Sequence, residues 1–198
     1  TNQLPQKLSL DFNSQILEFD LKDETTLNLD LAKRHKQFVA YEPPTLRAGL
    51  YYKIWQIMSP LPKNEQVILL NQIKQWASFP AANSKIEKCM TLEQLKELSE
   101  NSLFIIGGHT KSHPALAHHS KKIQQEEILE NKVFLEKELK RKINFFAYPS
   151  GNYNEDTLAL MQESEFEAAF TTNPYPVKGK TNIFKINRFQ VNNWNSEN

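Results

Sequence analysis

The sequence predicts an α/β fold, with a parallel sheet or barrel in the second half of the chain. Short apolar runs typical of buried strands alternate there with helical segments. The runs are residues 103–106, 144–148, 168–171 and 184–189. With 198 residues, 39% of them hydrophobic, the chain is long enough for one packed domain, or for a domain with a small appendage.

The start of the chain predicts a hairpin. Apolar and polar residues alternate across residues 7–21 around Asn13 and Ser14, a pair typical of a tight turn. The apolar members are Leu8, Leu10 and Phe12, followed by Ile16, Phe19 and Leu21. Residues 22–44 are mostly polar and end in two prolines, which indicates a connection.

Helical periodicity begins at Thr45 and is interrupted by Pro60 and Pro62, so we expect a helix on each side of these prolines. The apolar stripes are Leu46, Leu50, Ile54 and Ile57 in the first helix, and Leu69, Leu70, Ile73, Trp76 and Ala77 in the second. Residues 79–90 are predicted to form a loop. We therefore expect two regions, a hairpin and helical part in residues 1–90 and the strand-containing part in residues 91–198.

Three helices alternate with the apolar runs of the second region. Thr91 begins the first, because TLEQ has the form of a capping box. Ser120 caps a long helix that ends near Lys140. Its predicted inward stripe is Ile128, Leu129, Val133, Leu135 and Leu139. Asn154 caps the third helix, whose first turn carries two acids where the helix dipole favours them.

Charge and composition exclude several classes of protein. The net charge is +1 with acids and bases interspersed, so we expect no nucleic-acid partner. No stretch approaches the roughly 20 apolar residues of a membrane helix, so we expect no membrane span. Cys89 is the single cysteine, which excludes an internal disulfide. The first residues lack signal-peptide features, and the sequence does not distinguish a cytoplasmic from a cell-envelope location.

Four of the five histidines lie in GGHTKSHPALAHHS, residues 107–120. His109 and His113 follow a predicted buried strand, and ligands collect beyond the carboxyl ends of parallel strands. On one turn of helix-like backbone, two imidazoles four residues apart point at one ion. The pattern predicts a divalent metal site, with zinc as the natural metal and cobalt, nickel or iron as alternatives. The competing interpretation is a solvated loop, and we expect His118 and His119 to be exposed.

Two motifs carry a family resemblance. GGHTKSHP resembles the second motif, H-[ST]-x-x-H-P, of the polysaccharide deacetylases with NodB homology, carbohydrate esterase family 4. FFAYPSGNYN resembles the third motif of that family. FEAAFTTNPYPV and FKINRFQV are similar to its later strands, and PLPKNEQVILLNQIKQWASFPAA to an insertion. The resemblance covers nearly the whole chain and is strongest in residues 91–191.

The resemblance implies a distorted (β/α) barrel, here incomplete at its N-terminus and with the hairpin and helices of the first region as an insertion. It implies a metal held by two histidines and an aspartate, and hydrolysis of N-acetyl or O-acetyl groups on a polysaccharide or glycan. The implied metal ligands are His109 and His113, and the implied oxyanion donor is the Ser150 backbone N–H. Thr110, Tyr148, Pro149 and Gly151 are the implied groove residues, with Thr110 bracing the loop.

The chain departs from the family in several places. The first motif, T-F-D-D-G, supplies an aspartate ligand and the catalytic base, and it is absent. Asp11 and Asp20 come nearest to it, but they are expected at polar positions of a surface hairpin. Ala147 replaces a common arginine, and no histidine follows His119. Arg188 is expected to be either a substrate contact or a structural surface arginine.

Three hypotheses follow. In the first, the intact protein is a metal-dependent deacetylase whose aspartates come from segments upstream of Thr1, and this chain alone has little activity. In the second, the protein is a catalytically silent NodB-like carbohydrate-binding or scaffold protein. In the third, the histidine loop of an α/β domain binds nothing. An incomplete barrel also leaves an unpaired sheet edge, which predicts self-association.

Overall fold

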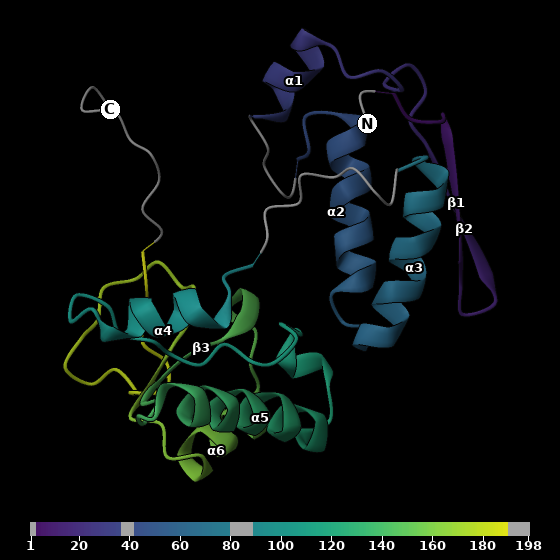
Figure 1. The fold of residues 1–198 in the computed structure, drawn as a ribbon. Coiled ribbons are helices and arrows are strands. Elements are labelled where there is room, and N and C mark those ends of the chain that lie inside the picture. The colour runs from purple at the N-terminus through teal and green to yellow at the C-terminus, as the bar shows by residue number, and fades with distance from the viewer. Residues whose placement is uncertain (1–2, 37–41, 80–88, 190–198) are drawn as a thin grey trace. The chain divides into compact units, whose positions relative to one another are not determined.

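A computed structural model describes residues 3–36, 42–79 and 89–189. The chain divides into two compact units, Thr1–Glu87 and Lys88–Asn198 (Figure 1). Each unit has a hydrophobic core of its own. Among the described helices, none is long and apolar enough to cross a membrane.

The first unit contains the predicted hairpin. Strands β1 (Lys7–Phe12) and β2 (Gln15–Asp20) pair antiparallel, and Asn13 and Ser14 between them have φ of 50° and 61°. Positive φ at both central residues gives the turn whose twist matches that of the strands. Leu8 and Leu10 are buried as expected, whereas Ile16 is 71% exposed. Ile16 lies opposite Asp11, on the solvent-facing side of the pair, so its predicted place in the stripe is wrong.

Helices α2 (Leu46–Met58) and α3 (Lys63–Trp76) confirm the two helices predicted around the prolines. Both contribute apolar side chains to the core beneath the hairpin, although Leu46 and Leu70 lie on exposed faces. The side-chain amide of Gln72 bonds both the N–H and the C=O of Asp11, at 2.8 and 3.0 Å. The helix therefore satisfies backbone groups at an edge of the hairpin.

A short helix, α1 (Leu29–His35), lies inside the segment that was predicted as a connection. The Asn28 side chain caps it by accepting a hydrogen bond from the Leu31 N–H, and Leu31 is its buried residue. A cap, an acid in the first turn and three basic residues in the last turn are the signals that identify it. A single buried side chain is too little for a hydrophobic stripe to reveal the helix.

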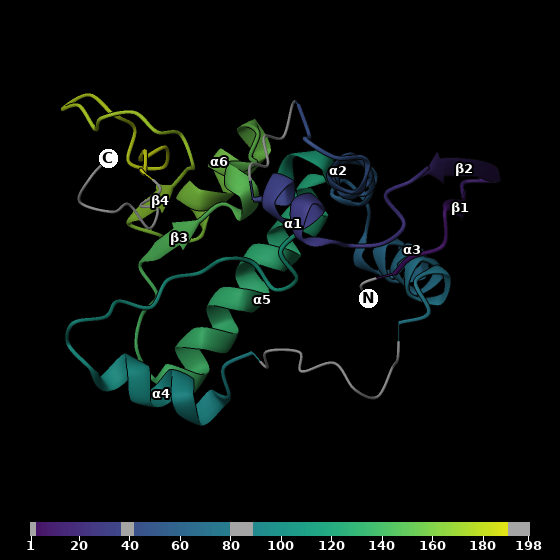
Figure 2. The ribbon, with the colours of Figure 1, turned by 90° about the horizontal axis from the view of Figure 1, so that it is seen from above.

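The second unit is built on a short parallel sheet. Strands β3 (Phe145–Ala147) and β4 (Ala168–Phe170) pair in parallel and lie side by side in Figure 2. Parallel bridges extend the sheet on both sides, from Gly108 to Phe146 and from Phe170 to Ile186. Four chain segments therefore run in one direction, in sequence order across the sheet. The α/β prediction is confirmed at this level.

Two predicted strands, at 103–106 and 184–189, are not formed, and these parts of the chain contribute only single bridges to the sheet. Residues 103–106 form no strand, and Leu103, Phe104 and Ile105 are 85%, 48% and 77% exposed. The contact with the sheet comes two residues later, at Gly108. Likewise, within residues 184–189 only Ile186 pairs. Apolar runs indicate burial on both faces of a sheet only where neighbouring strands and helices cover them, and the described residues provide no such cover at 103–105.

Three helices complete the second unit: α4 (Leu92–Glu100), α5 (Lys121–Leu139) and α6 (Glu155–Glu163). Thr91, Ser120 and Asn154 cap them as predicted. The core contains Ile128, Leu135 and Leu139 from α5 and Leu158, Leu160 and Met161 from α6, packed with Phe146 and Tyr148. Val133 was expected to point inward, but it is 61% exposed because it lies on another face of α5 from these leucines.

Candidate functional site

The candidate site lies where the parallel segments end. His109 directly follows the Gly108 bridge, Tyr148 follows β3, and Thr171 follows β4. Arg188 comes two residues after the Ile186 bridge. Because parallel segments end at the same edge of a sheet, the topology gathers these residues from four distant parts of the sequence.

The rings of His109 and His113 lie beside each other edge-on, with their centroids 4.8 Å apart and their planes at 71°. The backbone between them is not helical, so the expected turn of helix is wrong. Thr110 and His113 have φ of 63° and 60°, which breaks any right-handed helix there. The Thr110 hydroxyl oxygen accepts a hydrogen bond from the His113 N–H at 3.0 Å. A tight loop, held across its own residues, therefore brings the two rings together.

The Nδ1 atom of His109 lies 2.6 Å from the carbonyl oxygen of Ala147. A carbonyl only accepts hydrogen bonds, so Nδ1 carries the proton and donates. Desolvation of the ring is the main cause that lowers the pKa of His109. The nearby charges of His113 and Arg188 lower it further, against the opposing effect of the Ala147 bond. His109 is therefore neutral near pH 7, and its Nε2 lone pair is available.

Gly108 lets the loop approach the sheet closely. A Cβ at this position would lie 3.0 Å from the Phe146 ring and 3.2 Å from Asn131 Oδ1. The Gly108 backbone donates to Phe145 O and accepts from Ala147 N, at 2.8 and 2.9 Å. This close pairing places His109 beside Ala147 and so permits the Nδ1 bond.

The two imidazoles fit the nitrogen ligands that a divalent metal such as zinc requires. A ligating histidine presents one ring nitrogen to the metal and bonds a carbonyl or carboxylate with the other, as His109 does with Ala147. Within residues 3–36, 42–79 and 89–189, no group of three or more His, Cys, Asp or Glu side chains is arranged so that it could hold a metal ion. The described part of the chain therefore offers at most two candidate ligands, whereas a catalytic metal needs three or four.

The Pro149–Gly151 turn follows β3 at the same edge of the sheet. Ser150 and Gly151 have φ of 54° and 66°. The two hydrogen bonds of this turn are donated by Gly151 and Asn152, so the Ser150 N–H takes no part in them. Only glycine fits at 151, because a Cβ there would lie 2.1 Å from Thr172 Oγ1.

Of the predicted groove residues, Thr110, Tyr148 and Pro149 are buried and Gly151 is half-buried. The Tyr148 side chain is fully buried, and its hydroxyl donates to the Phe184 carbonyl at 2.8 Å. Burial raises the pKa of Tyr148 far above its ordinary value, so the hydroxyl stays protonated. Its side chain belongs to the core, which corrects the prediction that it lines a groove.

Arg188 is exposed, and its guanidinium Nε donates to the Thr171 carbonyl at 2.8 Å. Its backbone N–H donates to Asn173 O at 3.1 Å. Its charge is near enough to His109 to contribute to the lowered pKa of that imidazole. Arg188 thus joins the ends of neighbouring segments beside the candidate metal ligands.

The remaining histidines of the stretch behave differently from each other. His118 is exposed as expected. His119 was expected to be exposed, but it is half-buried, and its Nε2 atom is buried with no hydrogen-bond partner among the described residues. His119 precedes the Ser120 cap, and its carbonyl accepts a hydrogen bond from Gln124 Nε2. This bond ties His119 to the first turn of α5.

Three residues of α5 bond the histidine loop, and none of them was expected from the sequence. Glu130 forms an ion pair with the exposed side chain of Lys111, whereas the other two bond the loop backbone. Asn131 Oδ1 accepts from the His109 N–H at 3.0 Å. The Glu127 carboxylate accepts from the backbone N–H groups of Lys111 and Ser112. Their spacing of four residues on a predicted helix is the one signal that places them on a common face.

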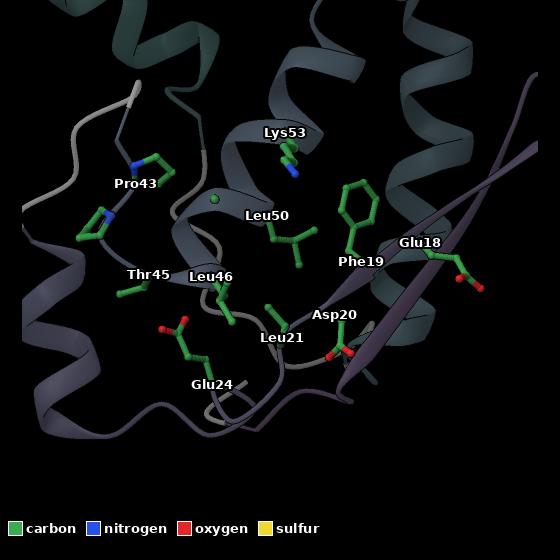
Figure 3. A pocket seen from close by; sticks show the side chains of 12 residues that line it. Glu18, Phe19, Asp20, Leu21, Glu24, Pro43, Thr45, Leu46, Leu50 and Lys53 are labelled. Carbon is green, nitrogen blue, oxygen red and sulfur yellow. The ribbon is translucent and has the colours of Figure 1, made fainter.

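The first unit contains a hollow of about 560 Å³ between β2 and the start of α2 (Figure 3). Glu18, Asp20 and Glu24 lie around it with Phe19 and Leu50. The Asp20 carboxylate accepts from Lys22 N and Gln6 Nε2, and these bonds lower its pKa. Asp11 is exposed in the same hairpin. Both aspartates thus occupy the surface-hairpin positions expected of them.

Known proteins resemble both the sequence and the fold. The sequence profile of the polysaccharide deacetylases matches residues 65–169, more than half of the chain. YxkH of Bacillus subtilis, named as a candidate polysaccharide deacetylase, is 26% identical over 102 residues, which are 52% of this chain and 36% of YxkH. This chain thus spans about a third of the length of that curated relative.

Solved structures of deacetylases are also similar to this chain. The deacetylase PplD of Streptococcus pyogenes, in complex with acetate, has a TM-score of 0.50 at 24% identity, over 63% of this chain and 58% of PplD. The deacetylase domain of BpsB from Bordetella bronchiseptica has a TM-score of 0.49 at 17% identity, over 58% and 57% of the two chains. The likeness to PplD supports the α/β fold. With the profile match over more than half of its length, the chain belongs to the polysaccharide deacetylase family.

Proposed function

We propose that the protein is a metal-dependent hydrolase that removes N-acetyl or O-acetyl groups from a polysaccharide or glycan. The observation that carries the proposal is the adjacent pair of His109 and His113 rings, with the Nδ1 atom of His109 bonded to the Ala147 carbonyl. That bond leaves the Nε2 lone pair of His109 for a metal. Family membership supports acyl hydrolysis as the chemistry.

The chain's own residues supply binding and orientation. His109 and His113 are the proposed ligands of a divalent metal, with zinc as the first choice and cobalt, nickel or iron as alternatives. When bound, the metal supplies a Lewis acid that activates water and polarises the acyl carbonyl. The Ser150 N–H, unused in its own turn, is the proposed donor to the negative oxygen that develops on that carbonyl. Exposed Arg188 is the proposed contact for the sugar.

A third ligand and the catalytic base belong to the same proposal. We place them outside the described residues, since those residues offer no carboxylate beside the imidazole pair. A complete (β/α) barrel would also cover exposed Leu103 and Ile105, next to the Gly108 bridge. Self-association through this edge remains a prediction, and light scattering of the purified chain tests it.

Metal analysis is the direct test. The purified chain is dialysed against Zn²⁺, and its metal content is measured beside that of a His109→Ala, His113→Ala double variant. We expect zinc in the first protein and its loss in the second. A His118→Ala variant, changed at an exposed histidine of the same loop, serves as the control and should keep the metal. Acetate release from N-acetylated and O-acetylated glycans is then measured with the full-length gene product.

The alternative is a catalytically silent carbohydrate-binding or scaffold protein. The same experiments separate the two functions. Equal metal content in the wild type and the double variant contradicts the metal site. Glycan binding by the full-length product without acetate release contradicts the hydrolase and favours the scaffold.

A further inference from the structure

The histidine loop is held from outside by side chains of α5. Asn131 Oδ1 accepts from the His109 N–H at 3.0 Å. Glu127 Oε2 accepts from the N–H groups of Lys111 and Ser112, at 3.0 and 2.8 Å. Glu127 Oε1 accepts from the Ser112 hydroxyl at 2.6 Å. Two side chains thus engage three of the five residues from His109 to His113.

Glu127 and Asn131, the two α5 side chains that accept hydrogen bonds from the loop backbone, are called the clamp below. Glu127 and Asn131 are four residues apart, so they project from the same face of α5, and both are half-buried. Hydrogen bonds to a carboxylate are stronger than those between neutral groups, because the acceptor is charged. Both residues sit within a long helix whose other face packs into the core. Both side chains of the clamp are therefore carried by a rigid helix, α5.

The loop needs such support. Thr110 and His113 have positive φ, a conformation that is disfavoured for residues other than glycine and persists only where the surroundings enforce it. Within the loop, the Thr110 hydroxyl bond to the His113 N–H is the one internal brace that the described contacts provide. Without contacts to α5, the backbone would relax and the two rings would separate.

We propose that Glu127 and Asn131 are positioning residues that hold this loop in the conformation where the imidazoles of His109 and His113 lie beside each other. The inference rests on the proposed function in one respect, namely that the pair then receives a metal. The hydrogen bonds of both side chains go to the loop and not to an imidazole, so both act through the backbone that carries the rings. The loop conformation is the direct consequence, and metal affinity is the indirect one.

The test compares substitutions on α5 in the otherwise unchanged chain. Glu127→Ala removes three accepted bonds, and Asn131→Leu removes the acceptor at similar size. Asn131→Asp keeps an acceptor oxygen at the end of the side chain. Glu127→Gln keeps one of the two side-chain oxygens. Glu126→Ala, at an exposed position of the same helix, is the control for the loss of a negative charge. Circular dichroism establishes that each variant is folded.

Two measurements are made on each folded variant. The first is amide hydrogen exchange of the metal-free protein at His109 and Ser112. Lys111 is left out because its N–H also donates to the Glu127 backbone carbonyl at 3.1 Å, and the substitutions keep that bond. We expect faster exchange there in Glu127→Ala and Asn131→Leu, wild-type exchange in Glu126→Ala, and recovery at His109 in Asn131→Asp. The second is the Zn²⁺ affinity by titration, which we expect to fall about tenfold or more, as for other residues that orient metal ligands.

The outcomes are distinct. Exchange rates in Glu127→Ala and Asn131→Leu that match the wild type overturn the clamp. Faster exchange with unchanged Zn²⁺ affinity also overturns it, because the ring pair would then not depend on these residues. If the wild type itself binds no Zn²⁺, the proposed function fails, and ring-to-ring nuclear Overhauser contacts between His109 and His113 decide the clamp instead. If Glu127→Ala does not fold, the same readings are taken on Glu127→Gln.

Discussion

The imidazole of His109 donates from Nδ1 to the carbonyl oxygen of Ala147, across 2.6 Å and between residues 38 positions apart. The bond links the end of one parallel segment to the end of its neighbour. It fixes the ring orientation and the tautomer together. Ala147, which stands where the family resemblance implies an arginine, thus acts through its backbone carbonyl. The type of its side chain does not reveal this contact.

The first prediction concerns this tautomer. In the metal-free chain above pH 7, His109 should be the Nδ1–H form, because its partner is a carbonyl that cannot donate. Two-bond proton–nitrogen NMR spectra of the imidazoles distinguish a protonated Nδ1 from a protonated Nε2. His118, which is exposed, provides the comparison within the same molecule. A protonated Nε2 at His109 would contradict the assignment and remove the lone pair that the metal site needs.

Local signals in the sequence predicted much of the fold. Caps at Thr91, Ser120 and Asn154 predicted where three helices begin, since each side chain satisfies a backbone N–H that the helix leaves open. The hairpin followed from alternation around Asn13 and Ser14. The apolar run at 103–105 was misleading, because its burial depends on neighbours that local sequence does not specify.

The candidate site was predictable only in its residue types. The spacing of His109 and His113 predicted that the rings meet, but not the left-handed backbone that brings them together. That backbone depends on Gly108 packing against Phe146 and on bonds from α5, all distant in sequence. The burial of the Tyr148 side chain likewise depends on Phe184, 36 residues later, so a motif alone could not predict it.

The second prediction concerns Gly151. Gly151→Ala should lower the free energy of unfolding by about 2–4 kcal/mol, because φ of 66° is strained for alanine and the new methyl meets Thr172 Oγ1. Urea unfolding measures the change. Gly179→Ala is the matched control, since nothing lies within 4 Å of a Cβ there, and it should be nearly neutral. Adding Thr172→Ala to the Gly151→Ala variant should restore the part of the stability that was lost through the contact with Thr172 Oγ1. If no stability is restored, the loss comes from backbone strain alone.

The third prediction concerns Lys132, which is 8% exposed. Its Nζ donates to the Ile143 carbonyl at 2.7 Å, pairs with Glu136 at 3.1 Å and lies 4.4 Å from the centre of the Phe166 ring. Lys132→Met should lower the free energy of unfolding by about 1–3 kcal/mol, because the Ile143 carbonyl loses its charged donor. Lys137→Met, at an exposed position of the same helix, should change it little. Equal losses in both would mean that the buried contacts contribute nothing specific.

The last prediction concerns His119 and pH. Burial is the main cause that lowers the pKa of its imidazole, and the neighbouring His118 lowers it further, whereas Glu127 opposes the change. A histidine with a lowered pKa in the folded state binds fewer protons than in the unfolded chain. The free energy of unfolding should therefore decrease as the pH falls below about 6.5, the ordinary histidine value, and on through the folded-state pKa. Urea unfolding at about pH 7.5 and about pH 5.5 measures this loss, and His119→Gln, which cannot titrate, should reduce it. His118→Gln tests whether the effect belongs to the buried ring, because His118 is exposed. If His118→Gln reduces the loss as much as His119→Gln does, the buried Nε2 atom of His119 is not its source.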